Sequence, residues 1–421
     1  MVEAPEIVIT GLGVVSPLGT GLDAFHQALV RGASGVRTIA QYDPTPRRVR
    51  IGAELPDFDP KLYVQPRKSL KVMSREIQIG FAAANLAVEH AGLTAHGVNP
   101  DRLGVIFGSQ MLYGEVEELA DLMRSCLVDG EFDFQQFGQQ FSSQLFPLWM
   151  LKYLPNMTAS HIGIAHDARG PNNSIVLGEA SGLLAVMEAI TVIQRGWAEV
   201  MLTGGGGSRL ALTPLIYRGD INLSHRNDDP ATASRPFDMH RDGMVNGEGA
   251  GALVIETRAH AEARGAQIFG RFLGFGCTHP GSSNSVAARR QAIAASIAQA
   301  LDAADLEPRA IGHVNAHGLS TLDNDQAEAQ AVRLVLGDVP VTALKSYFGN
   351  LGPGGGIVEL VASLLSLRDG LIYPHRNLTC PDPACPIQIV RGRPRSTQNK
   401  IVMKLSQSGT GQAAAIIVEA A

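Results

Sequence analysis

The sequence predicts a layered α/β fold in which helices cover both faces of a sheet. Short β-branched strands alternate with Ala-rich helical stretches along the chain, which is the pattern of such layers. The helical stretches carry apolar residues near 3.6-residue spacing. At 421 residues the chain exceeds the length at which one hydrophobic core stops growing, so two units are expected.

The elements follow in the same order in both parts of the chain. Strands are expected at EIVITGLGVV, RLGVIFGS, NSIVLG, EVMLTGGGG and GALVIET, then at IFGRFLGFG, HVNAHG, VTALKS, KIVMKLS and AAIIVEA. The long helices are expected at SREIQIGFAAANLAVEHAG, GEASGLLAVMEAITVIQRG, SVAARRQAIAASIAQALDAA and NDQAEAQAVRLVLG. The sequence is therefore divided into two similar halves, 1–255 and 256–421.

Composition excludes several classes of protein. Hydrophobic residues make up 45% and charged residues 18%, which is ordinary for a globular chain and not for a disordered one. The net charge is -5, with Lys and Arg scattered along the sequence. No basic stripe that would follow a phosphate backbone is present, so nucleic acid is not an expected partner.

The cysteines and the apolar runs indicate a cytoplasmic protein. Cys126, Cys277, Cys380 and Cys385 form neither a disulfide framework nor a zinc motif, so no metal is expected. The N-terminus lacks the basic region of a signal peptide. The longest apolar helix carries Glu188 and is shorter than the roughly 18 uncharged residues that a membrane span needs.

Two segments are not interpreted as binding motifs. The glycines of GLGVVSPLGTG follow a strand but lack the G-x-G-x-x-G spacing of a dinucleotide loop. Residues 132–151, FDFQQFGQQFSSQLFPLWML, are rich in Phe and Gln. They are interpreted as a packed loop or a subunit-contact excursion rather than a binding motif.

Polar groups gather where strands are expected to end, which is where open α/β folds bind ligands. In RGPNNSIVLGEASGLLAVMEAI, a strand, Gly178 and a helix have the outline of a nucleophile turn, with Glu179 at its apex. Three further groups follow: VNAHGLSTLDNDQAE with His317 and Glu328, LKSYFGNLGPGGGIVE with Lys345 and Asn350, and KLSQSGTGQAAA with Ser408, Gly409 and Thr410.

These groups, together with RNDDPATASRPFDMHRDGMVNGEGAGALVIE, resemble the β-ketoacyl carrier-protein synthases of the thiolase superfamily. The resemblance extends from VITGLGVVSPLG through ELPDFDPKLYVQPRK and LPNMTASHIGI to the closing strand. It implies a duplicated fold of five layers, α/β/α/β/α. It also implies a dimer in which each acyl pocket borders the neighbouring subunit.

Members of that family join an acyl group, held on a cysteine at a helix N-terminus, to a malonyl carrier protein. Substrate arrives on the phosphopantetheine of an acyl carrier protein, and no other cofactor is implied. By the resemblance, Glu179 takes the place of that cysteine and His317 that of the first of two histidines. Lys345 and Glu328 take the places of the charged pair that supports it. Asn350 takes the place of the second histidine.

Two further positions follow from the resemblance. The Phe-bearing turn that gates the family's pocket reads SQSGTGQ here, with Ser408, Gly409 and Thr410. This change predicts a more open or more polar mouth. Arg67, Lys68 and Lys71 lie where relatives present basic residues to an acidic carrier protein. The alternative for these three is a solvated helix start.

Replacement of the cysteine changes the expected chemistry. A carboxylate is a poor thioester nucleophile, whereas a thiolate at a helix N-terminus is a good one. The free N–H groups and partial positive charge of the helix start suit Glu179 as an anion, and His317 or Lys345 is the expected partner. Asn350 can still donate through its amide, so an Asn–His pair could hold a thioester carbonyl.

Three functions stay open at this point. The first is a non-condensing partner subunit of an active ketosynthase, as chain-length factors are, with Glu179 in a satisfied buried network. The second is an enzyme that uses Glu179 and His317 on an acyl or malonyl thioester, as a decarboxylase, hydrolase or lyase. A standard condensing enzyme is the third and least favoured. Acyl chain length, homo- or heterodimer, carrier and pathway are left open.

Overall fold

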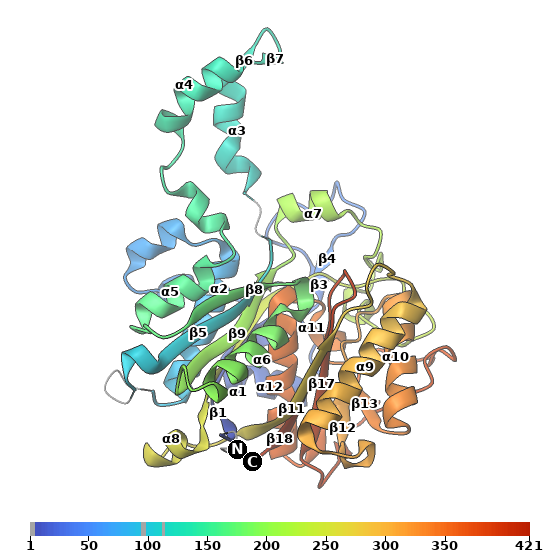
Figure 1. Cartoon of the computed structure of the whole chain (residues 1–421). Coiled ribbons are helices and arrows are strands. Elements are labelled where there is room, and N and C mark those ends of the chain that lie inside the picture. Colours follow the sequence, from blue (N-terminus) through green and yellow to red (C-terminus); the bar gives the residue numbers. More distant parts are fainter. Residues whose placement is uncertain (1–4, 94–97, 112–113) are drawn as a thin grey trace.

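A single hydrogen-bonded path of strands runs through the molecule (Figure 1). The computed structural model describes residues 5–93, 98–111 and 114–421. The ten principal strands of the described residues are β1 (Ile7–Ser16), β5 (Leu103–Ser109), β8 (Asn172–Val176), β9 (Val200–Ser208), β10 (Glu248–Thr257), β11 (Gly270–Thr278), β12 (His313–Asn315), β13 (Pro340–Thr342), β17 (Ile401–Gln407) and β18 (Ala413–Ala420).

Each expected strand is present, and the expected helices lie between them. The α-helices are α1 (Leu22–Val30), α2 (Arg75–His90), α3 (Val116–Ser125), α4 (Phe134–Gln144), α5 (Met157–Ala165), α6 (Ser181–Gln194), α7 (Leu212–Arg218), α8 (Arg258–Ala263), α9 (Val286–Ala304), α10 (Leu322–Leu336), α11 (Lys345–Phe348) and α12 (Gly355–Arg368). The strand expected at VTALKS ends early, so Lys345 begins α11 instead.

The order of the strands shows a duplication. From the first edge the path is β8-β5-β9-β10-β1, and from the other end it is β13-β12-β17-β18-β11, with the short β15 (Gln388–Ile389) beyond β13. Each run begins with parallel pairs and ends with antiparallel ones. A short antiparallel pairing of β1 with β11 joins them. The first run of strands ends with β10 at residue 257, and the second begins with β11 at residue 270. The predicted boundary after residue 255 falls at the end of β10.

Helices and sheets alternate in five layers, as predicted. α2 and α5 pack on the outer face of the first run of strands, and α9 and α10 pack on the outer face of the second. α6 and α12 lie between the two runs and share a core with both. These central helices are apolar nearly all round, because both of their faces are covered.

Glycines allow the central layer to pack closely on β9. A Cβ at Gly205 would stand 2.4 Å from the carbonyl oxygen of Pro353, and one at Gly108 would stand 2.5 Å from the backbone nitrogen of Gly182. Real Cβ atoms do not approach so closely, so the glycine run of β9 is a packing requirement. This contact places the start of α6 against the start of α12.

The segment that is rich in Phe and Gln forms an arm that projects from the body (Figure 1). α3, the hairpin of β6 (Leu127–Val128) and β7 (Glu131–Phe132), and α4 build it. Leu122, Cys126 and Leu145 form a small core of its own. Interpretation as a packed loop is therefore wrong, because the arm buries only this small cluster and leaves many apolar side chains exposed.

Residues 1–4, on which the prediction about a signal peptide partly rests, lie outside the described residues. Among the described helices, none combines the length and the apolar character that crossing a membrane requires.

Candidate functional site

Glu179 sits at a sharp turn between β8 and α6. Gly178 has φ +59°, a left-handed conformation that glycine adopts without strain. The hydroxyl of Ser181 donates to the Gly178 carbonyl at 2.7 Å and accepts the N–H of Leu177 at 2.7 Å. The expected nucleophile turn is therefore formed, with Glu179 8% exposed at its apex.

The predicted partners of Glu179 are wrong. Its Oε1 accepts from Nη1 of Arg209 at 2.7 Å and from Nδ2 of Asn350 at 3.0 Å. Arg209 follows the end of β9, and its Nε donates to Oδ1 of Asn246 at 3.1 Å. The predicted cations, His317 and Lys345, are engaged elsewhere.

These contacts keep Glu179 ionised. Burial alone raises the pKa of a carboxyl group, but Arg209, the hydrogen bond from Asn350 and its own backbone N–H outweigh burial. The pKa of Glu179 therefore lies below its ordinary value. A carboxylate whose charge is held by a guanidinium and an amide is stabilised as an anion and weakened as a nucleophile.

Lys345 is bound to α12 and to the loop of His317. Its Nζ donates to Glu359 Oε1 at 2.7 Å, to the His317 carbonyl oxygen at 2.9 Å and lies 3.3 Å from His317 Nδ1. Lys404, on β17, pairs with the other oxygen of Glu359. Burial lowers the pKa of Lys404 to about 8 although Glu359 opposes this shift. A fully buried carboxylate thus holds two lysines between the sheets.

Glu328 supports His317 through the backbone. Its two carboxylate oxygens accept the N–H groups of His317 at 2.6 Å and of Gly318 at 2.8 Å. The predicted support is therefore present, but the charged partner of Lys345 is Glu359 and not Glu328. Burial raises the pKa of Glu328, and these backbone hydrogen bonds oppose that rise.

His317 is a neutral hydrogen-bond donor in this arrangement. Burial lowers its pKa well below the ordinary value, and the charges of Lys345, Lys404, Arg289 and Arg209 lower it further. A neutral ring carries one proton. Because Nδ1 faces the ammonium of Lys345, the proton belongs on Nε2, and the ring can donate to a carbonyl oxygen.

Asn350 holds Glu179 instead of pairing with His317. Its Nδ2 donates to Glu179, and its Oδ1 accepts the N–H of Gly352 at 3.0 Å. The second N–H of the amide faces only Met244 Sδ at 3.5 Å, and an Asn–His pair on a thioester carbonyl stays a prediction.

The gate turn joins β17 to β18 and bonds to itself. The hydroxyls of Ser408 and Thr410 lie 2.8 Å apart, and Ser408 Oγ accepts the N–H of Gln412 at 3.1 Å. Ser408 is buried, whereas Gly409 and Thr410 are exposed. The expected polar mouth is present at Ser408.

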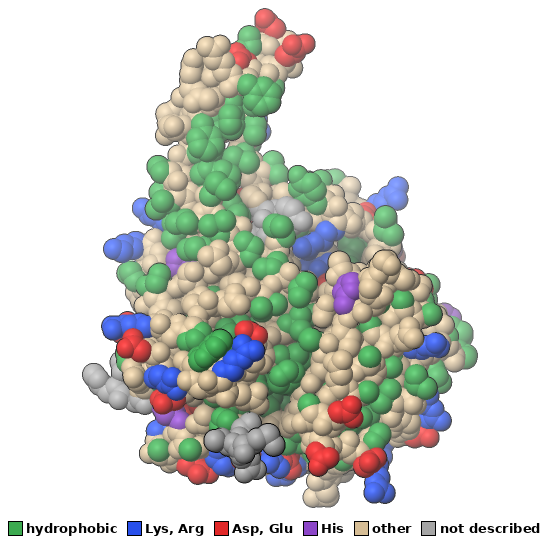
Figure 2. Space-filling view, in the orientation of Figure 1, with side chains coloured by type: hydrophobic (Ala, Val, Ile, Leu, Met, Phe, Trp, Pro, Cys, Tyr) green, Lys and Arg blue, Asp and Glu red, His purple; other side chains and the backbone are tan. Residues whose placement is uncertain are grey.

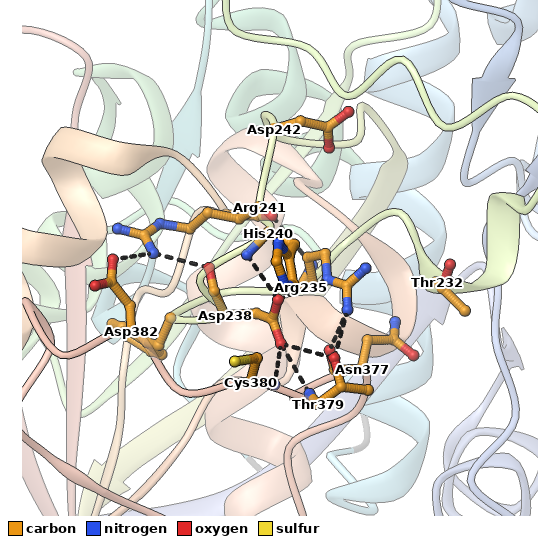
Figure 3. Close-up of polar contacts among 12 residues, drawn as sticks. Thr232, Arg235, Asp238, His240, Arg241, Asp242, Asn377, Thr379, Cys380 and Asp382 are labelled. Carbon is orange, nitrogen blue, oxygen red and sulfur yellow. Dashed lines mark hydrogen bonds and ion pairs between the residues drawn. The ribbon is translucent and has the colours of Figure 1, made fainter.

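The SRPFDMHRDG segment ties the two halves together (Figure 3). Asp238 accepts the N–H of Cys380 at 2.8 Å, and Nη1 of Arg241 donates to Asp382 at 2.7 Å. Arg241 also pairs with the start of α10, whose preceding loop carries His317. The segment therefore positions the site without belonging to it.

A cavity of about 390 Å³ opens beside these groups. Both halves line it, with Glu179, Arg209 and Asn246 from the first and Arg289, His317 and Ser408 from the second. None of the four cysteines, all of which are free thiols, lines the cavity. It therefore offers donors and a shielded carboxylate to a ligand, but no thiol nucleophile.

The predicted docking residues lie outside this cavity. Arg67, Lys68 and Lys71 are exposed on a 3₁₀ helix, Arg67–Val72, directly before α2. Among the described residues, no carboxylate lies within ion-pair distance of them. The described part of the chain also holds no cluster of three His, Cys, Asp or Glu residues that could bind a metal ion.

Sequence reasoning missed three buried cations, namely Arg209, Arg289 and Lys404. A buried carboxylate needs a cation, so Glu179 signalled that one was near but not which one. Arg209 directly follows the end of a strand, and polar residues at strand ends were the signal used to find the other site residues, so Arg209 could have been found in the same way. Arg289 lies among helical residues and has no such signal.

Residues 4–261 match the family "Beta-ketoacyl synthase, N-terminal domain", and residues 269–379 match "Beta-ketoacyl synthase, C-terminal domain". A 3-oxoacyl-[acyl-carrier-protein] synthase 2 of Synechocystis is 35% identical over 94% of this chain and 93% of its own length. The structure titled "The ishigamide ketosynthase/chain length factor" has a TM-score of 0.86 and 28% identity, with 99% of each chain covered.

A third similar protein is a type II polyketide ketosynthase solved in complex with its acyl-carrier protein. It has a TM-score of 0.83 and 26% identity over 100% of both chains. The matched domains cover nearly the whole chain. This chain belongs to the β-ketoacyl synthase family of fatty-acid and polyketide synthesis.

Proposed function

We propose that this protein is a non-condensing member of its family that serves as the partner subunit of an active ketosynthase, in the manner of a chain-length factor. The observation that carries the proposal is Glu179 at the nucleophile position, fixed by Arg209 and Asn350. The pair is buried, with side chains 10% and 9% exposed for Glu179 and Arg209.

Condensation needs a nucleophile that attacks a thioester and later leaves. A thiolate does both, whereas a carboxylate would form a mixed anhydride. Ion pairing with Arg209 lowers the nucleophilicity of Glu179 further. The chain retains the fold and the His317–Lys345 arrangement around a site without a thiol, as expected for a subunit that shapes a pocket.

The comparisons support a ketosynthase partner and an acyl carrier protein. The ishigamide structure is that of a ketosynthase and a chain-length factor, and the 26% identical structure contains an acyl-carrier protein. In our proposal substrate reaches this chain on the phosphopantetheine of a carrier, without another cofactor. Arg67, Lys68 and Lys71 form the docking surface, because an exposed basic group attracts an acidic carrier.

The surface at one edge of the sheet supports the proposal that a second subunit binds there. β8 pairs only with β5, so its other edge is unpaired within the described chain, and an open strand edge favours pairing with another chain. Hydrophobic side chains spread along the adjacent arm (Figure 2). Phe134 is 81% exposed and Met150 is 56% exposed. We propose that the ketosynthase covers this edge and the arm.

Co-expression with an active, cysteine-bearing ketosynthase from the same organism tests the proposal. A tagged form of this chain is expected to retain the ketosynthase at equal stoichiometry, measured by size exclusion with light scattering. Phe134→Asp is expected to weaken the complex at least tenfold, because a buried aromatic contact is worth about 2 kcal/mol. Leu334→Asp, an exposed leucine on α10, is the matched control. Recovery of only a homodimer contradicts the proposal.

The second candidate is an enzyme that acts on an acyl or malonyl thioester with His317 and Glu179. One observation favours it, namely that the neutral His317 lines the cavity with a donor on Nε2. Such a donor stabilises an enolate or a tetrahedral oxyanion. Decarboxylation, hydrolysis and lyase chemistry all use this group, and intact-mass analysis of acyl and malonyl carrier proteins separates them from a partner role.

A further inference from the structure

One exposed loop in the second half of the fold is strongly basic, although the chain has a net charge of -5. The loop reads RGRPR from Arg391 to Arg395, and its three arginines are exposed. No Asp or Glu occurs between Asp382 and Glu419. Among the described residues, no carboxylate lies within 4.0 Å of these three guanidinium groups. The loop therefore presents positive charge that the folded chain does not neutralise.

The backbone of the loop is fixed at both ends. Arg391 forms a β-bridge with His375. Arg395 lies in the short strand β16 (Arg395–Ser396), where it pairs with Ile372 of β14 (Leu371–Ile372). The loop is thus a built part of the surface rather than a loose tail.

A fourth arginine adjoins the loop. Arg376 directly follows His375 in the sequence, and its guanidinium donates to the carbonyl oxygen of Gly32. This contact brings the exposed Arg31, next to Gly32, close to the loop. We call Arg31, Arg391, Arg393 and Arg395 the basic surface.

The basic surface lies away from the cavity beside Glu179, and none of its four residues lines that cavity. β16 leads into the start of β17, whereas the gate turn follows the other end of that strand. Seven residues of strand span about 20 Å, and this length separates the Arg395 end of the loop from the gate. The loop also follows β15, at the opposite end of the strand path from β8. A subunit on the β8 edge therefore leaves the basic surface uncovered.

The surroundings of the loop favour an acidic protein over other anionic partners. Within residues 335–421, all of which are described, no large hydrophobic side chain is exposed, so none is available to enter a membrane. The same residues offer no exposed Phe, Tyr or Trp on which a nucleic-acid base could stack. Guanidinium groups match carboxylates as bidentate partners. A protein surface with several Asp and Glu side chains therefore fits best.

We propose that the basic surface is a second docking site for the acidic acyl carrier protein, separate from Arg67, Lys68 and Lys71. The inference rests on the proposed function for the identity of this partner. A carrier held here does not deliver its thioester to the cavity, but it raises the effective concentration of carrier near the entrance. Contacts between exposed charges form fast and are individually weak, so the carrier exchanges readily.

Calorimetric titration of the purified full-length chain with holo acyl carrier protein at low ionic strength counts the sites. Two equivalents of carrier are expected per chain. Arg391→Glu combined with Arg393→Glu is expected to weaken the second site about tenfold or more, because reversed charges repel an acidic partner, and to leave one equivalent. Arg67→Glu combined with Lys71→Glu is expected to remove the other equivalent and to keep the second.

The matched control is Arg195→Glu combined with Arg290→Glu, which makes the same change in net charge at two other exposed arginines. It is expected to keep both equivalents. A wild-type chain that binds one carrier or none overturns the inference. A folded variant with Arg391→Glu and Arg393→Glu that keeps both equivalents also overturns it.

Vesicle flotation tests the membrane as the other occupant. Vesicles of equal parts phosphatidylglycerol and phosphatidylcholine are expected not to retain the chain. Retention that is lost in the variant with Arg391→Glu and Arg393→Glu, with carrier binding unchanged, assigns the surface to lipid and overturns the inference. The titration uses no ketosynthase, so its failure is distinct from failure of the co-expression test.

Discussion

Arg209→Met is expected to lower the free energy of unfolding by about 3–5 kcal/mol, because it leaves the carboxylate of Glu179 buried without its cation. Both side chains are about nine-tenths buried, so solvent compensates only weakly for the lost charge. Urea denaturation at pH 7 measures the change. Arg290→Met, an exposed arginine, is the matched control and is expected to stay within about 0.5 kcal/mol of wild type.

The pH dependence of the same variant has a definite sign. In wild type the pKa of Glu179 is lowered, so the pair stabilises the fold above the carboxyl's unfolded pKa and loses this effect as pH falls below it. In Arg209→Met the effect of burial on Glu179 loses its largest opponent, so the pKa of that carboxyl group rises. The folded variant then takes up a proton first, and its deficit shrinks as pH falls from 7 to 5.

A double variant separates the charge from the packing of Arg209. Glu179→Gln in the Arg209→Met background is expected to recover most of the lost stability, because no buried charge remains. A deficit below about 1 kcal/mol for Arg209→Met, the range of an exposed ion pair, would show that the pair does not stabilise Glu179 at the turn.

Glu359→Gln is expected to cost a similar amount, about 3–5 kcal/mol, because two buried lysines would lose the carboxylate they share. Lys345 and Lys404 are nearly inaccessible, at 2% and 0% exposure, and both pair with Glu359. Chemical denaturation measures the loss. Glu262→Gln, whose side chain is 62% exposed, is the matched control.

Alkaline pH is expected to reduce that deficit. The pKa of Lys404 is about 8 in the folded protein, below the ordinary value, so the unfolded chain binds more protons above that pH and stability rises with pH. Without Glu359 this pKa falls further, and the rise begins at lower pH. A deficit that grows between pH 7 and 9 would contradict this assignment of the buried charges.

The order of strands and helices was predictable because it depends on local pattern. Apolar periodicity located the ten principal strands, and the turn at Gly178 was visible because a strand, a glycine and a helix follow one another. Lys345 was misplaced by a few residues, since the strand that precedes it ends early and α11 begins there. Strand ends of this kind depend on packing that a short window of sequence does not contain.

The pairing inside the site depends on contacts between distant residues. Glu179 and Arg209 are 30 residues apart, and Lys345 and Glu359 come from different helices. Glu359 was also overlooked. Its ion pair with Lys345 explains why Lys345 does not reach Glu179. An excursion from the body was one of two interpretations of residues 132–151, because Phe and Gln residues fit a packed segment as well as an exposed one.

Intact-mass analysis of carrier proteins tests the non-condensing role most directly. The purified protein is incubated with acyl and malonyl carrier protein, with Glu179→Gln and Glu179→Cys variants alongside. We expect wild type to leave both carriers unchanged and to form no 3-oxoacyl product, whereas Glu179→Cys takes up the acyl group. The non-condensing role would be contradicted if wild type alone released the acyl group, removed carbon dioxide from malonyl carrier protein or formed a condensation product.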